Sequence, residues 1–199
     1  DPSGFEANVD VTMKASAVNP RNEDSFSVSA MVNVPVSDNF AIRVVGFTAE
    51  DGGYIDNIEG VSARFGLNKN TDFDPSAVHE DVNSFKSDGG RIFGRWETEG
   101  GYIQAGISAQ NNQADGYNYF DPTIGDLQKI AFFEEPRSDD WTQLSLTIEH
   151  DLGWAKLISA TSYFDRDIHY VNDRSVYANY FGTFCYYYNG SPAGWSKYC

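Results

Sequence analysis

Cysteine is scarce in this chain of 199 residues, since Cys185 and Cys199 are the only two. No paired Cys or His spacing accompanies them, which excludes a zinc site of the usual structural kinds. We expect one disulfide between them that closes a small loop, and this would place the protein in an oxidising compartment. The alternative is a pair of reduced thiols without a role.

Positive charge and histidine are also in short supply. The chain has 14 Lys and Arg against 29 Asp and Glu, so its formal charge is −15. Such a chain repels phosphates, which excludes nucleic-acid binding through a basic patch. His79, His150 and His169 stand apart, with no nucleophile elbow and no HExxH motif. The sequence therefore predicts no enzymatic activity, no bound metal and no cofactor.

Long apolar runs are missing as well. The longest stretch without charge, residues 175–196, is interrupted by Gly182, Gly190, Pro192 and Gly194, so it does not form a helix across a bilayer. The chain starts at Asp1, and no apolar signal-peptide core follows. We therefore expect a chain that begins after processing or cleavage.

Aromatic residues are abundant, with 14 Phe, 12 Tyr and 4 Trp, and this argues against disorder. Apolar and polar side chains alternate with a period of two, the pattern of strands with one apolar face. The pattern predicts an all-β fold without a major helix. The seven alternating segments are residues 5–17, 25–34, 40–49, 91–97, 102–109, 142–149 and 154–170.

Short and long connections alternate between these segments. The short ones, residues 35–39, 98–100 and 151–153, have the length and composition of hairpin turns. The long ones are residues 18–24, 50–84, 111–140 and everything after 170. In an up-and-down antiparallel sheet, this alternation places the tight turns at one end and the large loops at the other.

Two architectures explain an apolar strand face, and the pattern favours the first. A transmembrane β-barrel turns its apolar side chains to lipid and its polar ones to the lumen, and has short turns at one end and long loops at the other. A soluble sandwich buries the apolar face against a second sheet. The polar sides carry charges that a wet lumen tolerates: Glu6, Asp10, Lys14, Arg91, Arg95 and Glu149. A barrel must close, so an odd set of about seven strands predicts part of a larger one.

Among others, the segments at residues 33–47, 51–57 and 91–97 resemble TonB-dependent outer-membrane receptors, most closely the group abundant in Gram-negative bacteria of the Caulobacter and Sphingomonas kind. Residues 33–47 resemble the second hairpin of that family, residues 51–57 the start of an outer loop, and residues 91–97 the next descending strand. The other matching segments are residues 115–117, 120–122 and 159–167.

This resemblance implies that residues 1–199 are the N-terminal portion of a 22-stranded barrel, without its plug domain and closing strands. It implies active uptake of a scarce nutrient, such as a ferric siderophore, a corrinoid or an oligosaccharide, at the outer membrane of a Gram-negative bacterium. The implied partners are membrane lipid, the nutrient, and the TonB complex acting through a plug. No position of this sequence matches the family's energy-coupling residues.

Ligand contacts in such a receptor are expected from the acidic, aromatic outer loops. We predict Tyr117, Tyr119, Phe120 and Asp121 as ligand-binding residues, with packing of the loop on itself as the alternative. Oxygen-bearing side chains recur in residues 68–74, but Phe73 and His79 replace the glycine and glutamate of a calcium loop. A soluble, secreted β-sandwich that binds carbohydrate is the alternative function.

Overall fold

A computed structural model describes residues 4–15, 24–61, 69–72 and 74–175. The chain divides into two compact units. The sheet unit comprises Asp1–Gly52, Phe85–Ala114 and Arg137–His169, and the loop unit comprises Gly53–Ser84, Asp115–Pro136 and Tyr170–Cys199. No helix among the described residues is long and apolar enough to cross a membrane.

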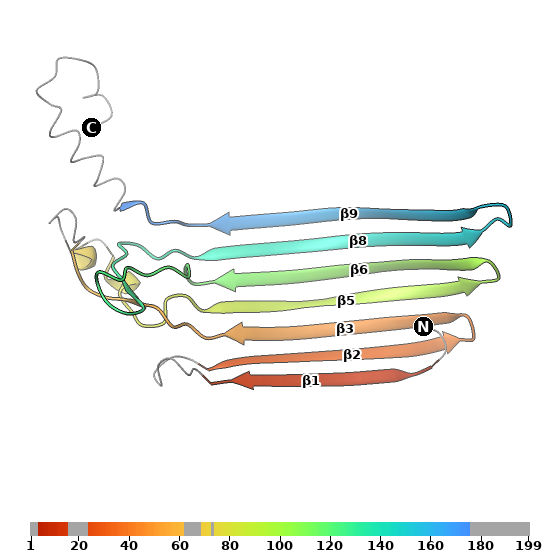
Figure 1. Ribbon diagram of the computed structural model, residues 1–199, viewed down its shortest axis with the longest axis horizontal. Helices are drawn as coiled ribbons and strands as arrows, with labels where there is room; N and C mark the ends of the chain where they lie inside the picture. Colours follow the sequence, from red (N-terminus) through yellow and green to blue (C-terminus); the bar gives the residue numbers. More distant parts are fainter. Residues whose placement is uncertain (1–3, 16–23, 62–68, 73, 176–199) are drawn as a thin grey trace, which may run out of the picture. The chain divides into compact units, whose positions relative to one another are not determined.

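The sheet unit is a single seven-stranded antiparallel sheet whose strands follow one another in chain order (Figure 1). This confirms the predicted all-β, up-and-down arrangement. The strands are β1 (Glu6–Lys14), β2 (Ser25–Ser37), β3 (Phe40–Asp51), β5 (Phe85–Thr98), β6 (Gly101–Ala114), β8 (Arg137–Asp151) and β9 (Lys156–Tyr170).

Tight turns join β2 to β3, β5 to β6 and β8 to β9 at the same end of the sheet (Figure 1). The last turn uses Gly153 at a φ of 82°, and the Asp151 carboxylate accepts the Gly153 N–H at 2.7 Å. At the opposite end, several strands continue beyond their predicted limits. For example, β5 begins at Phe85, which pairs with Ala114, because backbone pairing continues after the apolar pattern has stopped.

The strand register gathers apolar side chains on one side of the sheet, the apolar face. A typical row across the sheet runs from Val44 through Ile92 and Ile107 to Leu144. Nine large side chains in the middle of this face have exposed fractions of 37% to 66%. They are Val9, Val32, Val44, Ile92, Trp96, Ile103, Ile107, Leu144 and Leu146.

The polar face carries the alternate residues of the same strands. Its aromatic rings lie over glycines on neighbouring strands: Phe47 is opposite Gly89, and Phe93 is opposite Gly106. A Cβ added at Gly89 would lie 2.8 Å from the Phe47 ring, and one at Gly106 would lie 2.3 Å from the Phe93 ring. These rings thus cover the gaps that glycine leaves in the sheet.

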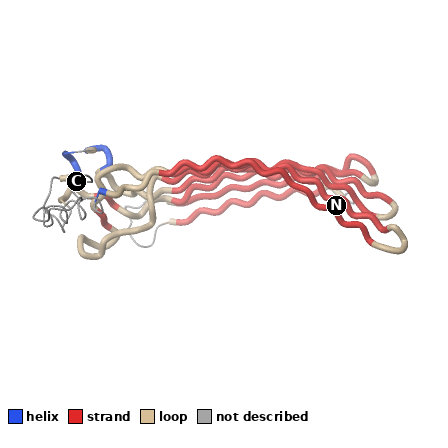
Figure 2. Tube along the Cα trace, turned by 90° about the horizontal axis from the view of Figure 1, so that it is seen from above, coloured by secondary structure: helices blue, strands red, loops and turns tan. Residues whose placement is uncertain are grey.

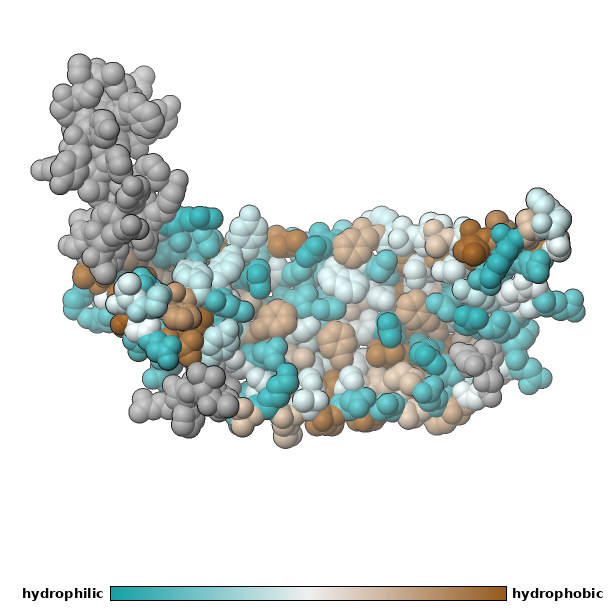
Figure 3. All heavy atoms as spheres, viewed as in Figure 1, coloured by the Kyte–Doolittle hydropathy of each residue, from teal (hydrophilic) through white to brown (hydrophobic). Residues whose placement is uncertain are grey.

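The strands form one layer, as the edge-on view shows (Figure 2). Among the described residues of the sheet unit, no second sheet covers the apolar face. Figure 3 shows one side of the molecule, where hydrophilic and hydrophobic side chains are mixed over the strands.

The loop unit has a small core of its own. Its buried apolar residues are Ile55, Ala77, Val82, Ala131 and Phe132. Two short parallel strands, β4 (Asp56–Asn57) and β7 (Gln128–Lys129), join the first two of its three chain segments. The 3-10 helices η1 (Asn70–Asp72) and η2 (Pro75–Ala77) complete it, and Asp74 caps η2.

Candidate functional site

A buried ion pair lies at the centre of the loop unit. Lys129 Nζ is 3.0 Å from Glu135 Oε2, and their side chains are 5% and 1% exposed. The Tyr119 hydroxyl donates to the same carboxylate at 2.8 Å, and the Asp173 backbone N–H donates to its other oxygen at 2.9 Å. Glu135 therefore ties the segment that precedes β8 to the segment that follows β9.

Buried asparagines connect the remaining segments. Asn57 and Asn70 each donate through Nδ2 to the carbonyl of Ala131, both at 3.1 Å. Asn83 accepts from two consecutive backbone N–H groups, at 2.8 and 2.9 Å. An amide offers both donors and acceptors, so it satisfies loop backbone that has no strand partner. The space beside these groups is about 10 Å³, room for roughly one water.

Three of the four predicted ligand residues, Tyr117, Tyr119 and Asp121, have contacts within the loop unit. The Tyr117 and Tyr119 ring centroids are 6.3 Å apart, and Lys129 Nζ lies 4.8 Å from the Tyr119 ring centroid. The Asp121 carboxylate accepts the backbone N–H of Thr123 at 2.9 Å and its hydroxyl at 2.6 Å. Phe120 is 39% exposed. Tyr119 and Asp121 thus shape the loop, and a ligand role for the four residues stays a prediction.

The surroundings of Tyr119 and Asp121 shift the pKa values of these two side chains. Burial, and then the hydrogen bond to Glu135, raise the pKa of Tyr119 above its usual range. Hydrogen bonds from the Thr123 hydroxyl and backbone lower the pKa of Asp121. A raised pKa in the folded state means that Tyr119 contributes stability below the pKa of an unfolded tyrosine, about 10, and that this contribution is lost as the pH rises further.

We therefore expect Tyr119 to stay protonated between about pH 9 and about pH 11 in the folded protein. Titration of the phenolate absorbance measures this, with Tyr119→Phe compared with the parent. The substitution should leave the absorbance of the folded protein unchanged over this range, and should lower it in denaturant. A loss of phenolate signal in the folded protein would contradict the assignment.

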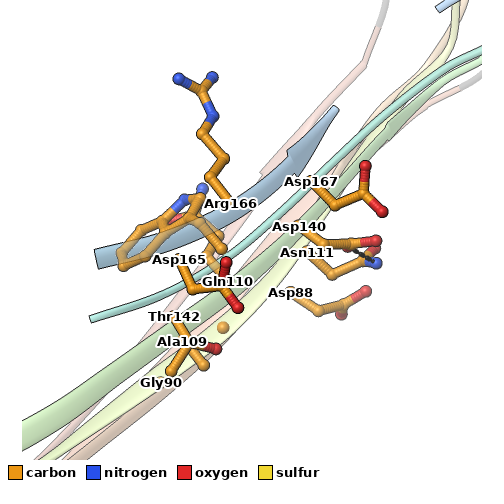
Figure 4. Close-up of a pocket in the computed structure, with 12 residues that line it drawn as sticks. Asp88, Gly90, Ala109, Gln110, Asn111, Asp140, Thr142, Asp165, Arg166 and Asp167 are labelled. Atoms are coloured by element: carbon orange, nitrogen blue, oxygen red, sulfur yellow. Dashed lines mark hydrogen bonds between the residues drawn. The ribbon is translucent and has the colours of Figure 1, made fainter. Parts of the chain in front are cut away.

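A second feature is a shallow hollow of about 550 Å³ over β5, β6, β8 and β9. Gly90, which has no side chain, and Ala109, which has only a methyl group, belong to its lining. In Figure 4, Asp88, Asn111, Asp140 and Asp167 point the same way, while Arg166 points to the other side of the sheet. The hollow is therefore bordered by carboxylates on the side of the apolar face.

Four polar residues form one row across the apolar face, at the end of the sheet opposite the tight turns. Thr48 lies opposite Asp88, which is opposite Asn111, which is opposite Asp140. The Thr48 hydroxyl donates to Asp88 at 2.6 Å, and the Asn111 amide donates to Asp140. On β3, β5, β6 and β8, this polar row marks the position where the apolar side chains of the apolar face end. No group of three or more His, Cys, Asp or Glu in the described part of the chain is arranged to hold a metal ion.

The oxygen-bearing residues between 68 and 74 serve local structure. Asn70 donates through Nδ2 to the Ala131 carbonyl, Asp72 accepts the Lys69 N–H at 3.0 Å, and Asp74 caps η2. Asn68 and Phe73 lie outside the described residues, and so do Cys185 and Cys199 with their predicted disulfide.

No family model, no curated protein and no solved structure matches this chain. The sequence reasoning also missed the Lys129–Glu135 pair. Its only signal in the sequence was a lone lysine within an acidic loop, six positions before the second of two adjacent glutamates.

Proposed function

We propose that the chain is part of the barrel of a TonB-dependent outer-membrane receptor, which takes up a scarce nutrient such as a ferric siderophore, a corrinoid or an oligosaccharide. The observation that carries this proposal is the exposed apolar face on a single-layer sheet whose other face is polar. Lipid is the solvent in which such an apolar face is stable, and water is the solvent for the other face.

The dimensions of the apolar band support a membrane location. On β6, it comprises Ile103, Ala105, Ile107 and Ala109, and ends at Asn111. These four rows, each two residues long, cover about 27 Å along the strand. This length corresponds to about 20 Å across a bilayer if the strand is tilted by about 40°. This is close to the apolar band of roughly 25 Å of outer-membrane barrels. Phe40 and Trp96, which pair at the turn end, would contribute to the aromatic girdle of such a barrel.

The connections support the same orientation. Short turns at one end would face the periplasm, and the longer connections at the other end would form outer loops. The edges of the sheet, β1 and β9, would pair with further strands of a closed barrel, for which the resemblance implies 22. A soluble sandwich needs a second layer over the apolar face, and the described residues of the sheet unit contain none.

Single-tryptophan variants test this orientation. Trp96 is 55% exposed on the apolar face, whereas Trp141 lies on the polar face with its ring centroid 5.9 Å from that of Phe164. In each variant, the other tryptophans become Phe. In vesicles, a lipid brominated near its carbonyl end should quench Trp96 fluorescence strongly and Trp141 fluorescence little. Equal quenching of the two would contradict the proposal.

Uptake requires a separate measurement in cells. Deletion of the gene should abolish accumulation of one nutrient of the classes named above, and collapse of the inner-membrane proton gradient should have the same effect. Uptake that persists without the gradient would refute TonB-driven transport.

A further inference from the structure

Cations gather on the polar face, although the whole chain carries a formal charge of −15. Seven of the 14 Lys and Arg residues of the chain alternate with the apolar positions of the strands and so belong to this face. They are Lys14, Arg43, Arg91, Arg95, Arg137, Lys156 and Arg166.

Three of these arginines form a cluster on β3 and β5, the arginine cluster. Arg43 pairs directly with Phe93, and Arg91 and Arg95 stand two positions to either side of Phe93 on β5. The alternation of a strand turns all of them to the polar face. Diagonal neighbours of this kind have Cα atoms about 7–8 Å apart, within reach of long side chains.

Carboxylates do not balance this cluster. Arg43 is 3.4 Å from Glu6, and both side chains are largely solvated, at 40% and 61% exposure. Arg95 binds Glu97 through Nε at 2.6 Å, and its guanidinium carbon lies 3.7 Å from the Tyr102 ring centroid.

Arg91 is exposed, and its direct cross-strand neighbours are Val45 and Ser108. Within the described residues, no carboxylate lies within ion-pair distance of Arg91. Three guanidinium groups thus have two carboxylates between them.

We propose that Arg43, Arg91 and Arg95 form a binding site for a small ligand that carries two or more carboxylate or phosphate groups. A guanidinium offers paired N–H donors that match the two oxygens of such a group. Arg91 brings an uncompensated charge, and Arg43 and Arg95 have further N–H groups beyond those bound to Glu6 and Glu97. Ser108 adds a hydroxyl beside Arg91. This inference rests on the proposed function, because a dissolved ligand reaches these arginines only if the polar face is in contact with water.

Citrate and inorganic pyrophosphate are the probes, and calorimetry on the full protein in detergent is the measurement. Arg91→Gln should weaken binding about tenfold, and Arg91→Lys should restore part of the loss, because it keeps the charge but not the fork. Lys86→Gln is the matched control: it makes the same change in net charge on the same strand, but on the opposite face, and should leave affinity unchanged.

Several results would overturn the site. They are absence of binding to both probes, equal affinities of the Arg91→Gln and Lys86→Gln proteins, and binding of an oligoglutamate peptide without binding of either probe. The tryptophan quenching experiment does not involve Arg91. Loss of the site with Trp96 still quenched by lipid would therefore remove this inference and leave the proposed function in place.

Discussion

Leu144→Arg should destabilise the folded protein in a lipid bilayer by about 2–4 kcal/mol, the cost of an arginine near the midplane on the lipid face of a barrel. Leu144 is 48% exposed on the apolar face, opposite Ile107, so the substitution replaces a side chain that is only half buried. The loss of stability would then come from placing the guanidinium group in contact with lipid. Equilibrium unfolding from vesicles in urea measures the change in the free energy of unfolding.

Ser145→Arg is the matched control, since Ser145 is the next residue on the same strand and faces the other way. On the polar face, the new guanidinium meets water, so we expect a change within about 0.5 kcal/mol. Equal losses from the two variants would show that both faces meet the same medium. A free energy of unfolding unchanged by Leu144→Arg would refute contact between the apolar face and hydrocarbon.

Glu135→Gln should open the loop unit. The substitution leaves the buried Lys129 ammonium without its counter-charge, and breaking a buried ion pair from one side costs about 3–5 kcal/mol. Hydrogen exchange of the Phe132 and Asp173 amides reports on this unit, because both N–H groups are bound within it, to Asp173 Oδ2 and Glu135 Oε1. Their protection should fall, while that of the sheet amides should not.

Glu134→Gln is the control for this experiment, because Glu134 is exposed and immediately precedes Glu135. It should leave amide protection in the loop unit unchanged. Replacing the pair together, as Lys129→Met with Glu135→Leu, should recover much of the lost protection, since no buried charge then remains unpaired. Equal exchange in the Glu135→Gln and Glu134→Gln proteins would contradict the stabilising role of the pair.

The strands of the sheet and the two faces that they present can be read from the amino-acid sequence alone. Period-two alternation is local, so the residues between Phe40 and Phe47 reveal their faces without knowledge of any partner strand. The lengths of the turns then imposed the up-and-down order. The strand ends were less predictable, because Phe85 and Ala114 lie in strands only through pairing with each other.

Contacts between residues that are distant in the sequence, in contrast, depend on the folded chain. Arg43 and Arg91 become neighbours because β3 pairs with β5 across a long connection, which contains the whole first segment of the loop unit. Lys129 and Glu135 form a buried pair because other segments fold around them and remove water. Such contacts depend on register and on burial, which are properties of the whole fold, and no local pattern in the sequence encodes them.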